Sequence, residues 1–218
     1  MTFMTEVMTV PRRAPQQKRG EETVQRILDA AGTLLCTIPL EFVTTSRIAK
    51  EAGLSVGALY RFYPDKQTIF DAVAVRHVAQ FRDCLEIGVM HPLRQEWTTH
   101  GPRINAAKFL EDVISSYVAY MDRCPDFRAL ALGQLISAGT KAREASPISG
   151  LPSVLKSFLL EWMRVPSTPE LEMMLSVASE AGERLLAYAY EQPSREARAR
   201  IIEEMKRMLV GYLFVRQG

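Results

Sequence analysis

Residues 44–70, TTSRIAKEAGLSVGALYRFYPDKQTIF, contain the pattern that decides the fold of this chain. Thr44 can cap a helix with its hydroxyl, and apolar residues then recur at the three- and four-residue spacings of one buried helical face. Gly53 stands where helices commonly end in positive φ, and Ser55 can cap the next helix. The stretch predicts two short helices joined by a turn of about three residues, with a third helix directly after them.

The second of these helices begins near residue 56 and has two unlike faces, at about 100° per residue. Its inward face is expected to contain Val56, Leu59, Phe62 and Tyr63. Gly57 and Arg61 point away from Leu59, although a glycine inside a helix costs roughly 1 kcal/mol relative to alanine. The outward glycine therefore indicates that another surface comes close to the backbone, and the DNA major groove is one such surface.

Two further residues favour the same interpretation. Tyr60 lies on the flank of this helix, where its phenol can reach a phosphate oxygen, and Lys66 opens the third helix near the same backbone. Arg61 suits a bidentate contact with guanine, and a phosphate contact would give the same sequence pattern. The pattern as a whole is that of a DNA-binding helix-turn-helix.

The amino-terminal third of the chain resembles the signature of the tetracycline-repressor (TetR) family of bacterial transcriptional regulators. The matching positions are Thr44, Thr45, Ile48, Ala49, Ala52, Gly53, Leu54, Ser55, Gly57, Leu59, Tyr60, Tyr63 and Lys66. The resemblance places helix one at roughly residues 21–36, with the apolar stripe Ile27, Leu28, Ala31, Leu34 and Leu35. Two features depart from the family: residues 38–41 replace the glycine that usually closes helix one, and Phe62 stands where histidine is common. We expect Phe62 to pack or to touch a thymine methyl.

The resemblance implies a ligand-responsive repressor that binds a palindromic operator as a homodimer and is released by a small molecule. It divides the chain into a basic arm over residues 1–20, a DNA-binding domain over residues 21–70 with its helix-turn-helix at about 44–63, and a helical effector-binding and dimerisation domain over residues 71–218. The expected DNA-binding residues are Thr44, Thr45, Arg47, Ser55, Val56, Gly57, Ala58, Tyr60, Arg61 and Lys66.

Positive charge is concentrated in the same third of the chain. Residues 1–70 hold 9 Lys and Arg against 7 Asp and Glu, whereas residues 71–218 hold 18 of each kind. A stretch without acidic residues contains Arg12, Arg13, Lys18 and Arg19, and we expect it to form an extended, disordered arm. Such an arm either enters a minor groove and adds salt-dependent affinity, or stays solvated without contacts.

Composition and motifs argue against several other classes. Of 218 residues, 47% are apolar and 24% charged, as in ordinary globular proteins. No targeting segment or membrane span is visible, so we expect a cytoplasmic protein. The spacing of Cys36, Cys84 and Cys124 indicates inert thiols in a reducing compartment, with a redox sensor as the less favoured reading. No metal, cofactor or catalytic motif is found, which predicts a non-enzyme, and His77, His91 and His100 are expected at the surface or at helix ends.

The rest of the chain predicts helices nearly throughout, so the expected fold class is all-α. Helices are expected over residues 65–88, 104–123, 126–137, 152–165, 168–191 and 194–216, with loops at 91–101 and 138–150. Asp126 is expected to cap the helix that follows Pro125.

The last two of these helices are separated by a short turn at Gln192 and Pro193 and should form an antiparallel hairpin. They either bury their apolar surface in their own domain or, as in the resembled family, join the same pair of a second subunit. Two-fold DNA half-sites favour the dimer. The expected interface residues are Leu175, Ala178, Gly182, Leu185, Met205, Leu209 and Tyr212.

Residues suited to an effector pocket are aromatic or flexible, although at helical spacing such residues are more often core. They are Tyr117, Met121, Phe158, Trp162 and Met163, and they favour an apolar or aromatic effector. Two other classes remain open: a protein-interaction module that does not bind DNA, and a helical small-molecule carrier or enzyme. Neither explains why basic charge, Tyr60 and Lys66 gather at one end of the chain.

Overall fold

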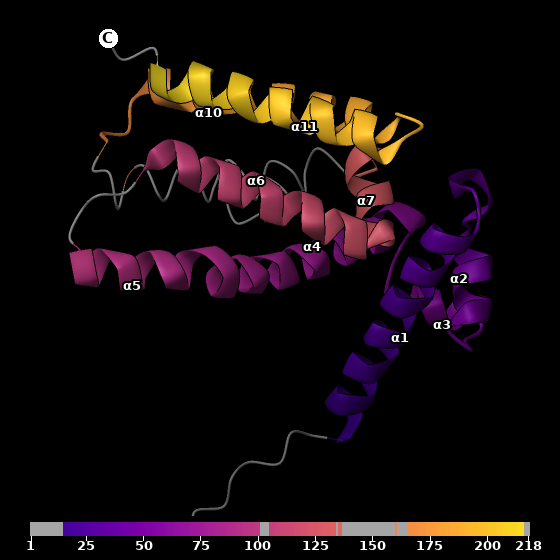
Figure 1. Cartoon of the computed structure of the whole chain (residues 1–218). Helices are drawn as coiled ribbons and strands as arrows, with labels where there is room; N and C mark the ends of the chain where they lie inside the picture. Colours follow the sequence, from indigo (N-terminus) through magenta and orange to yellow (C-terminus); the bar gives the residue numbers. More distant parts are fainter. Residues whose placement is uncertain (1–14, 101–104, 134, 137–159, 161–164, 216–218) are drawn as a thin grey trace, which may run out of the picture.

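A computed structural model describes residues 15–100, 105–133, 135–136, 160 and 165–215, and these residues form helices and connecting turns without a strand (Figure 1). In chain order the elements are α1 (Pro15–Thr37), η1 (Leu40–Phe42), α2 (Thr45–Glu51), α3 (Val56–Tyr60), α4 (Lys66–Leu85), η2 (Glu86–Met90), α5 (His91–His100), α6 (Ala106–Arg123), α7 (Pro125–Leu132), α10 (Pro169–Tyr190), α11 (Arg195–Val210) and η5 (Gly211–Val215). The all-α prediction is confirmed.

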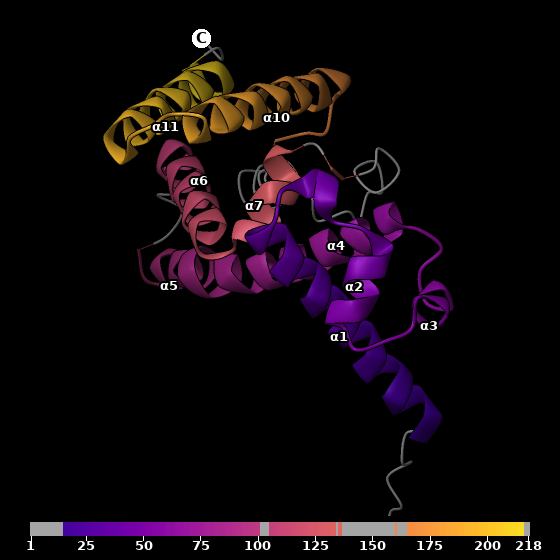
Figure 2. The ribbon, with the colours of Figure 1, turned by 90° about the vertical axis from the view of Figure 1, so that its right-hand side faces the viewer.

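Helices α1, α2 and α3, which we call the head, lie together at one end of the molecule, and the α10–α11 hairpin lies at the opposite side (Figures 1 and 2). The head is built around fully buried Ile27, Ile48 and Leu59, together with Ile69 of α4. These are apolar residues at the helical spacings that the sequence shows. Helix α1 also packs against α4 and α7, so the head is joined to the rest of the fold through α1.

Helix α1 begins at Pro15, earlier than expected, so Lys18 and Arg19 belong to a helix and not to an extended arm. Proline is well suited to the first helical position, and glutamine, lysine and arginine are good helix formers. The start of α1 projects beyond the other helices in both views (Figures 1 and 2). Arg12 and Arg13 lie outside the described residues.

The loop predicted at residues 91–101 is wrong, because residues 91–100 form α5. Helix α4 continues into α5 through the π-helical segment η2, in which the His91 N–H donates to Glu86 O. Proline inside an α-helix clashes with the carbonyl four residues earlier. The wider turn of η2 directly before Pro92 relieves that clash, which is a common origin of such segments.

Helix α7 is shorter than predicted, since it ends at Leu132 with Gly133 as its C-cap. Cys124 and not Asp126 occupies its N-cap position, and Asp126 lies in the first turn. Of the predicted helix over residues 152–165, only Leu160 and Val165 are described. The predicted loop at 138–150 lies outside the described residues.

The last two helices begin where the sequence predicts. Thr168 caps α10 by accepting from the Leu171 N–H at 3.2 Å, and Ser194 caps α11 by accepting from the Ala197 N–H at 3.0 Å. The two helices pack side by side as a hairpin above α6 (Figure 1). Among the described helices, none has the length and apolar character that crossing a membrane would need.

Candidate nucleic-acid interface

The turn between α2 and α3 is fixed by backbone hydrogen bonds. The Leu54 N–H donates to Ala49 O at 2.8 Å, and the Gly53 N–H donates to Lys50 O at 3.0 Å. This pair of bonds is a Schellman motif, which needs a left-handed residue at the helix end. Gly53 supplies that residue with a φ of +65°. The predicted position of the turn is therefore confirmed.

Side chains cap three helix starts around this turn. Thr44 caps α2 at 3.2 Å, Ser55 caps α3 at 3.1 Å and Asp65 caps α4 at 2.7 Å, each by accepting from a backbone N–H. The bonds from the Thr68 backbone and hydroxyl hold the pKa of Asp65 below its usual range. The starts of α2 and α3 are thus set by the predicted caps, and Asp65, which was predicted inside the third helix, caps α4.

Helix α3 is short and exposed. Of its five residues only Leu59 is buried, and the place where a Cβ of Gly57 would lie has no atom within 4 Å. Val56 and Phe62 were expected on the buried face but are 38% and 39% exposed. Phe62 is exposed because α3 ends at Tyr60, so its inward face does not extend that far, whereas Val56 is the first residue of the helix.

A hydrogen bond joins the two helices at the side away from the turn. The hydroxyls of Thr45, at the start of α2, and Tyr60, at the end of α3, lie 3.1 Å apart. Tyr60 is 49% exposed, so its phenol remains open to a ligand. Lys66 follows at the start of α4, with its ammonium 5.5 Å from the centre of the Phe70 ring.

The structure brings the ten predicted DNA-binding residues to the same end of the fold, at the starts of α2, α3 and α4 and along α3. Seven are exposed, namely Thr44, Arg47, Ser55, Val56, Gly57, Tyr60 and Arg61, and three are half-buried, namely Thr45, Ala58 and Lys66. Residues 40–42 add one feature that the sequence did not indicate. The exposed Phe42 ring lies 5.9 Å below the guanidinium of Arg47 and restricts where that cation can point.

Arg26 of α1 is a second residue that sequence patterns did not single out. Its Nη2 donates to the carbonyl of Ala52 and lies 3.3 Å from the carbonyl of Gly53. These carbonyls belong to the turn between α2 and α3. The signal was absent because Arg26 and the turn are far apart in sequence, and an exposed arginine on a helix has no distinctive spacing.

A buried polar network joins α4, α6 and α7 next to α1. His77 is 6% exposed, which corrects the prediction of a surface position. Its Nε2 lies 2.7 Å from Asp126 Oδ2, and its Nδ1 lies 2.9 Å from the Tyr120 hydroxyl, which donates to Gln80 at 3.0 Å. Both ring nitrogens of His77 therefore have a hydrogen-bond partner inside the fold.

This network lies next to α1, which is part of the head. A Cβ on Gly32 of α1 would lie 2.8 Å from Asp126 Oδ2, so α1 approaches α7 closely there. Burial alone would raise the pKa of Asp126, but the hydrogen bond and charge of His77 outweigh it and lower that pKa. Beside it, Arg76 of α4 lies 2.5 Å from Asp29 of α1. The Arg76–Asp29 ion pair therefore joins the head to α4, and Gly32 allows α1 to pack closely against α7.

Helix α7 contributes to both hydrophobic cores. Phe127 packs in the larger core among α4, α6, α10 and α11, whereas Leu130 packs in the core of the head. Just after the helix, the carbonyl of Leu135 accepts from Gln67 of α4 at 2.6 Å. A movement of α7 would therefore change the packing of both the larger core and the core of the head.

The two predicted pocket residues that the structure describes both belong to the larger core, where Tyr117 is half-buried. Met121 is fully buried, and Tyr117 stacks edge-on against Phe81 and Phe127 at 5.2 and 6.0 Å. Burial raises the pKa of Tyr117 above its usual range. Phe158, Trp162 and Met163 lie outside the described residues. Both residues thus lie in the larger core, and Tyr117 belongs to its aromatic cluster.

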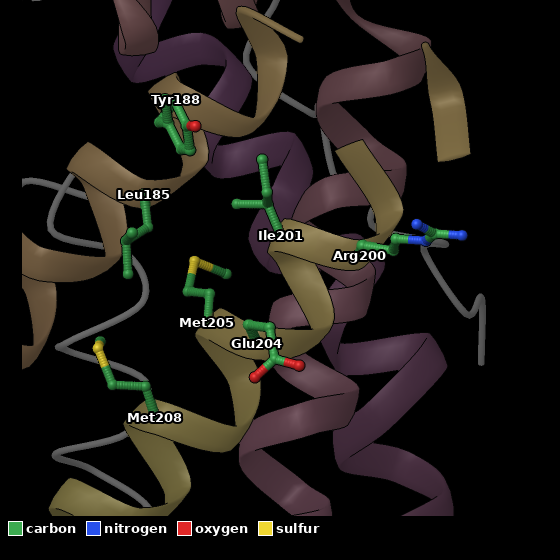
Figure 3. Close-up of a pocket in the computed structure, with 7 residues that line it drawn as sticks. All are labelled: Leu185, Tyr188, Arg200, Ile201, Glu204, Met205 and Met208. Atoms are coloured by element: carbon green, nitrogen blue, oxygen red, sulfur yellow. The ribbon is translucent and has the colours of Figure 1, made fainter. Parts of the chain in front are cut away.

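A cavity of about 440 Å³ lies elsewhere, between α10 and α11. It is lined by Leu185, Tyr188, Arg200, Ile201, Glu204, Met205 and Met208. Figure 3 shows the apolar side chains of the two helices facing one another, while the Arg200 guanidinium points away. The cavity is therefore apolar inside with charged groups at its rim.

The predicted dimer residues mostly belong to the interior of this chain. Leu175, Ala178, Met205 and Leu209 are at most 7% exposed, and Gly182 is also buried. Leu185 and Tyr212 are half-buried. The prediction chose the inward face of the hairpin because that face has the more regular apolar spacing. The apolar residues that remain exposed on the hairpin are Met173, Val177, Tyr188 and Met208.

The capped turn, the exposed α3 and the helical body define the fold of a helix-turn-helix regulator. The model of the family "Bacterial regulatory proteins, tetR family" matches residues 27–73, and that of "Tetracyclin repressor-like, C-terminal domain" matches residues 107–213. The chain belongs to the TetR family of transcriptional regulators.

The chain is similar to known proteins over different lengths. A TetR-family regulator from Streptomyces coelicolor has a TM-score of 0.63 at 23% identity, covering 88% of this chain and 97% of its own. The TetR-family repressor FadR from Thermus thermophilus, solved in complex with lauroyl-CoA, has a TM-score of 0.60 at 20% identity, covering 89% and 97%. The nucleoid occlusion factor SlmA of Haemophilus ducreyi is 39% identical over 70 residues, which are 32% of this chain and 35% of that protein. The chain thus matches about a third of the length of its curated relatives.

Proposed function

We propose that this protein is a ligand-responsive repressor that binds a palindromic operator as a homodimer and leaves it when a small molecule binds. The observation that carries the proposal is the open outward face of α3. Gly57 has free space above it, and among the described residues the Arg61 side chain has no hydrogen-bond partner. A helix held at both ends and empty on one face fits a major groove.

The residues around α3 divide by the contact that each suits. Arg61 and Gly57 face outward and suit base edges, Arg61 as a bidentate donor to guanine. Hydroxyls, backbone N–H groups at helix starts and cations suit phosphate oxygens. The proposed phosphate-side residues are Thr44, Thr45, Arg47, Ser55, Tyr60 and Lys66, with Val56 and Ala58 in apolar contact along α3.

Dimerisation is proposed through the outer face of the α10–α11 hairpin. Met173, Val177 and Tyr188 recur on one face of α10 and are 68%, 48% and 47% exposed, beside Met208 at 43%. Exposed apolar residues gathered on one helix face are a common feature of interfaces. A two-fold pairing of hairpins places two heads on one DNA duplex, as half-sites one helical turn apart require.

Release by an effector is proposed to act through α7. An apolar or aromatic molecule entering near Tyr117 and Met121 would displace Phe127, which contacts Tyr117, and so would shift α7. Because Leu130 of the same helix packs in the head, the shift would change the spacing of the two heads. A ligand acts in this way only by binding one arrangement better than the other.

The test is selection of bound fragments from random double-stranded DNA by the purified chain at two salt concentrations. Recovery of a palindrome, bound more weakly at higher salt, supports a dimeric DNA-binding regulator. Arg61→Ala should relax one base position, and Tyr60→Phe should weaken all sites alike. Absence of enrichment at either salt, with and without cell-extracted small molecules, contradicts the proposal.

The dimer is tested separately by sedimentation. Met208→Glu should shift the chain towards monomer, because a charge would be buried unpaired in the interface. Ile87→Glu is the matched control, since Ile87 is 76% exposed and lies on η2 away from the hairpin. Equal sedimentation of both variants and the parent chain would exclude this face as the interface.

A further inference from the structure

Helix α3 is too short to hold its own position. An isolated helix of five residues is unstable in water, and Leu59 is the one residue of α3 that is buried. The angle between α2 and α3 therefore depends on the turn that joins them. That turn contains Ala52, Gly53 and Leu54, and its conformation decides where Gly57 and Arg61 point.

The backbone bonds of the turn do not use the carbonyls of Ala52 and Gly53. The Schellman motif uses the carbonyls of Ala49 and Lys50. The carbonyls of Ala52 and Gly53 follow after Glu51, and both accept from Nη2 of Arg26. One guanidinium from α1 thus binds two carbonyl oxygens that the motif does not use. Its positive charge also lies at the carboxyl end of α2, where the helix dipole favours a cation.

Gly53 meets two demands at once because of this contact. Its φ of +65° disfavours any side chain. A Cβ at this position would also lie 2.9 Å from Arg26 Nη2, which is too close for an undisturbed contact. The glycine therefore allows the arginine to approach the backbone as well as allowing the turn itself.

We infer that Arg26 is a positioning residue that fixes α3 for specific DNA recognition by clamping the turn from α1. The inference rests on the proposed DNA-binding function. With the Thr45–Tyr60 bond at the far side, α3 is held at both ends by polar contacts while its outward face stays free. The guanidinium of Arg26 binds backbone carbonyls and not phosphate. We therefore expect Arg26 to affect the specificity for one DNA sequence over another and not the general affinity for DNA.

The experiment measures the affinity of the full chain for two duplexes across a salt series. One duplex is the operator recovered by selection, and the other is a scrambled duplex of equal length. Arg26→Ala is compared with Arg26→Lys, which keeps the charge without the planar fork, and with Arg82→Ala, an exposed arginine of α4 outside the head. All affinities are measured at a temperature where circular dichroism shows each variant folded.

Arg26→Ala is expected to bind the operator about tenfold more weakly, as loss of two charge-assisted hydrogen bonds implies. Binding to the scrambled duplex and the salt slope should not change, Arg26→Lys should fall between, and Arg82→Ala should match the parent chain. If Arg26→Ala does not fold, the test rests on Arg26→Lys. A reduced ratio of operator affinity to scrambled-duplex affinity in Arg26→Lys supports the inference. An unchanged ratio overturns it.

Two other results overturn the positioning role. Equal loss on both duplexes with a salt slope lower by about one would make Arg26 a phosphate contact. A lower melting temperature with an unchanged affinity ratio would make it a purely structural residue. A parent chain that binds neither duplex would instead refute the proposed function, before any variant is compared.

Discussion

Helix α3 and the α10–α11 hairpin are held in place by different forces. Helix α3 has five residues and one buried side chain, and its position depends on caps, the Schellman turn, Arg26 and the Thr45–Tyr60 bond. Helices α10 and α11 have 22 and 16 residues and bury apolar side chains at nearly every turn. A helix that must keep one face free for a ligand cannot be stabilised by covering that face, so polar bonds at its ends take over.

This difference predicts that stability and binding respond to different substitutions. A polar bond contributes roughly 0.5–1.5 kcal/mol net, whereas truncation of a buried leucine costs about 2–5 kcal/mol. Substitutions in the hairpin should therefore mainly lower the free energy of unfolding. Changes around α3 should act mainly on DNA affinity, with smaller effects on stability.

The largest effect is expected in the hairpin. Leu209→Ala should lower the free energy of unfolding by about 2–5 kcal/mol, because Leu209 is 3% exposed and packs against α10 near Gly182. Urea unfolding followed by circular dichroism measures the change. Ile87→Ala, at a residue 76% exposed, should stay within about 0.5 kcal/mol of the parent chain. Equal losses in both variants would show that burial does not dominate here.

The next effect lies at the joint between the two regions. Asp126→Asn should cost about 1–3 kcal/mol at neutral pH, because His77 loses its charged acceptor in a buried site. The pKa of Asp126 is lower in the folded than in the unfolded chain. Its stabilisation is therefore complete above the unfolded value, about 3.9, and is lost as the pH falls through the folded value.

The measurement for this joint is the stability difference between parent chain and variant from pH 7 down to acid. The difference should shrink only below about pH 4. Asp112→Asn breaks an exposed pair with Lys108 and should cost less than about 1 kcal/mol at every pH. A difference that is constant with pH would show that Asp126 does not act through its charge.

A smaller effect is expected at the turn. Gly53→Ala should cost roughly 1–2 kcal/mol, since alanine disfavours a φ of +65°. Part of the cost should vanish in an Arg26→Ala background, because the new Cβ would lie 2.9 Å from Arg26 Nη2. Thermal unfolding of the two single variants and the double variant gives this coupling. Strictly additive costs would mean that the arginine moves aside freely.

The sequence predicted local structure best where one residue type has one physical reason. Gly53 ends α2, Thr44 and Ser55 cap helices, and α10 and α11 form a hairpin, as predicted. Each of these depends on neighbours within a few residues. The same local logic failed at Pro92, because a π-helical segment can absorb a proline that usually ends a helix.

Long-range contacts were not predictable in the same way. His77 gave no signal of burial, since its partners Tyr120 and Asp126 come from other helices. Arg26 likewise reaches a turn that is distant in sequence. The hairpin showed which helices pair but not which face stays outside, because regular apolar spacing marks the inner face that the chain itself covers.

The smallest change in stability should give the clearest separation of the two regions. Gly57→Ala should raise the free energy of unfolding by about 0.5–1 kcal/mol, because alanine favours a helix and its Cβ would meet no atom within 4 Å. The same methyl should weaken operator binding about tenfold, since it occupies the space that DNA would enter. Gly88→Ala has equally open surroundings on η2 and should change neither operator affinity nor the sequence recovered by selection. A Gly57→Ala variant that is more stable and binds as tightly as the parent chain would mean that no surface approaches the backbone there, and that this glycine is not part of the DNA contact.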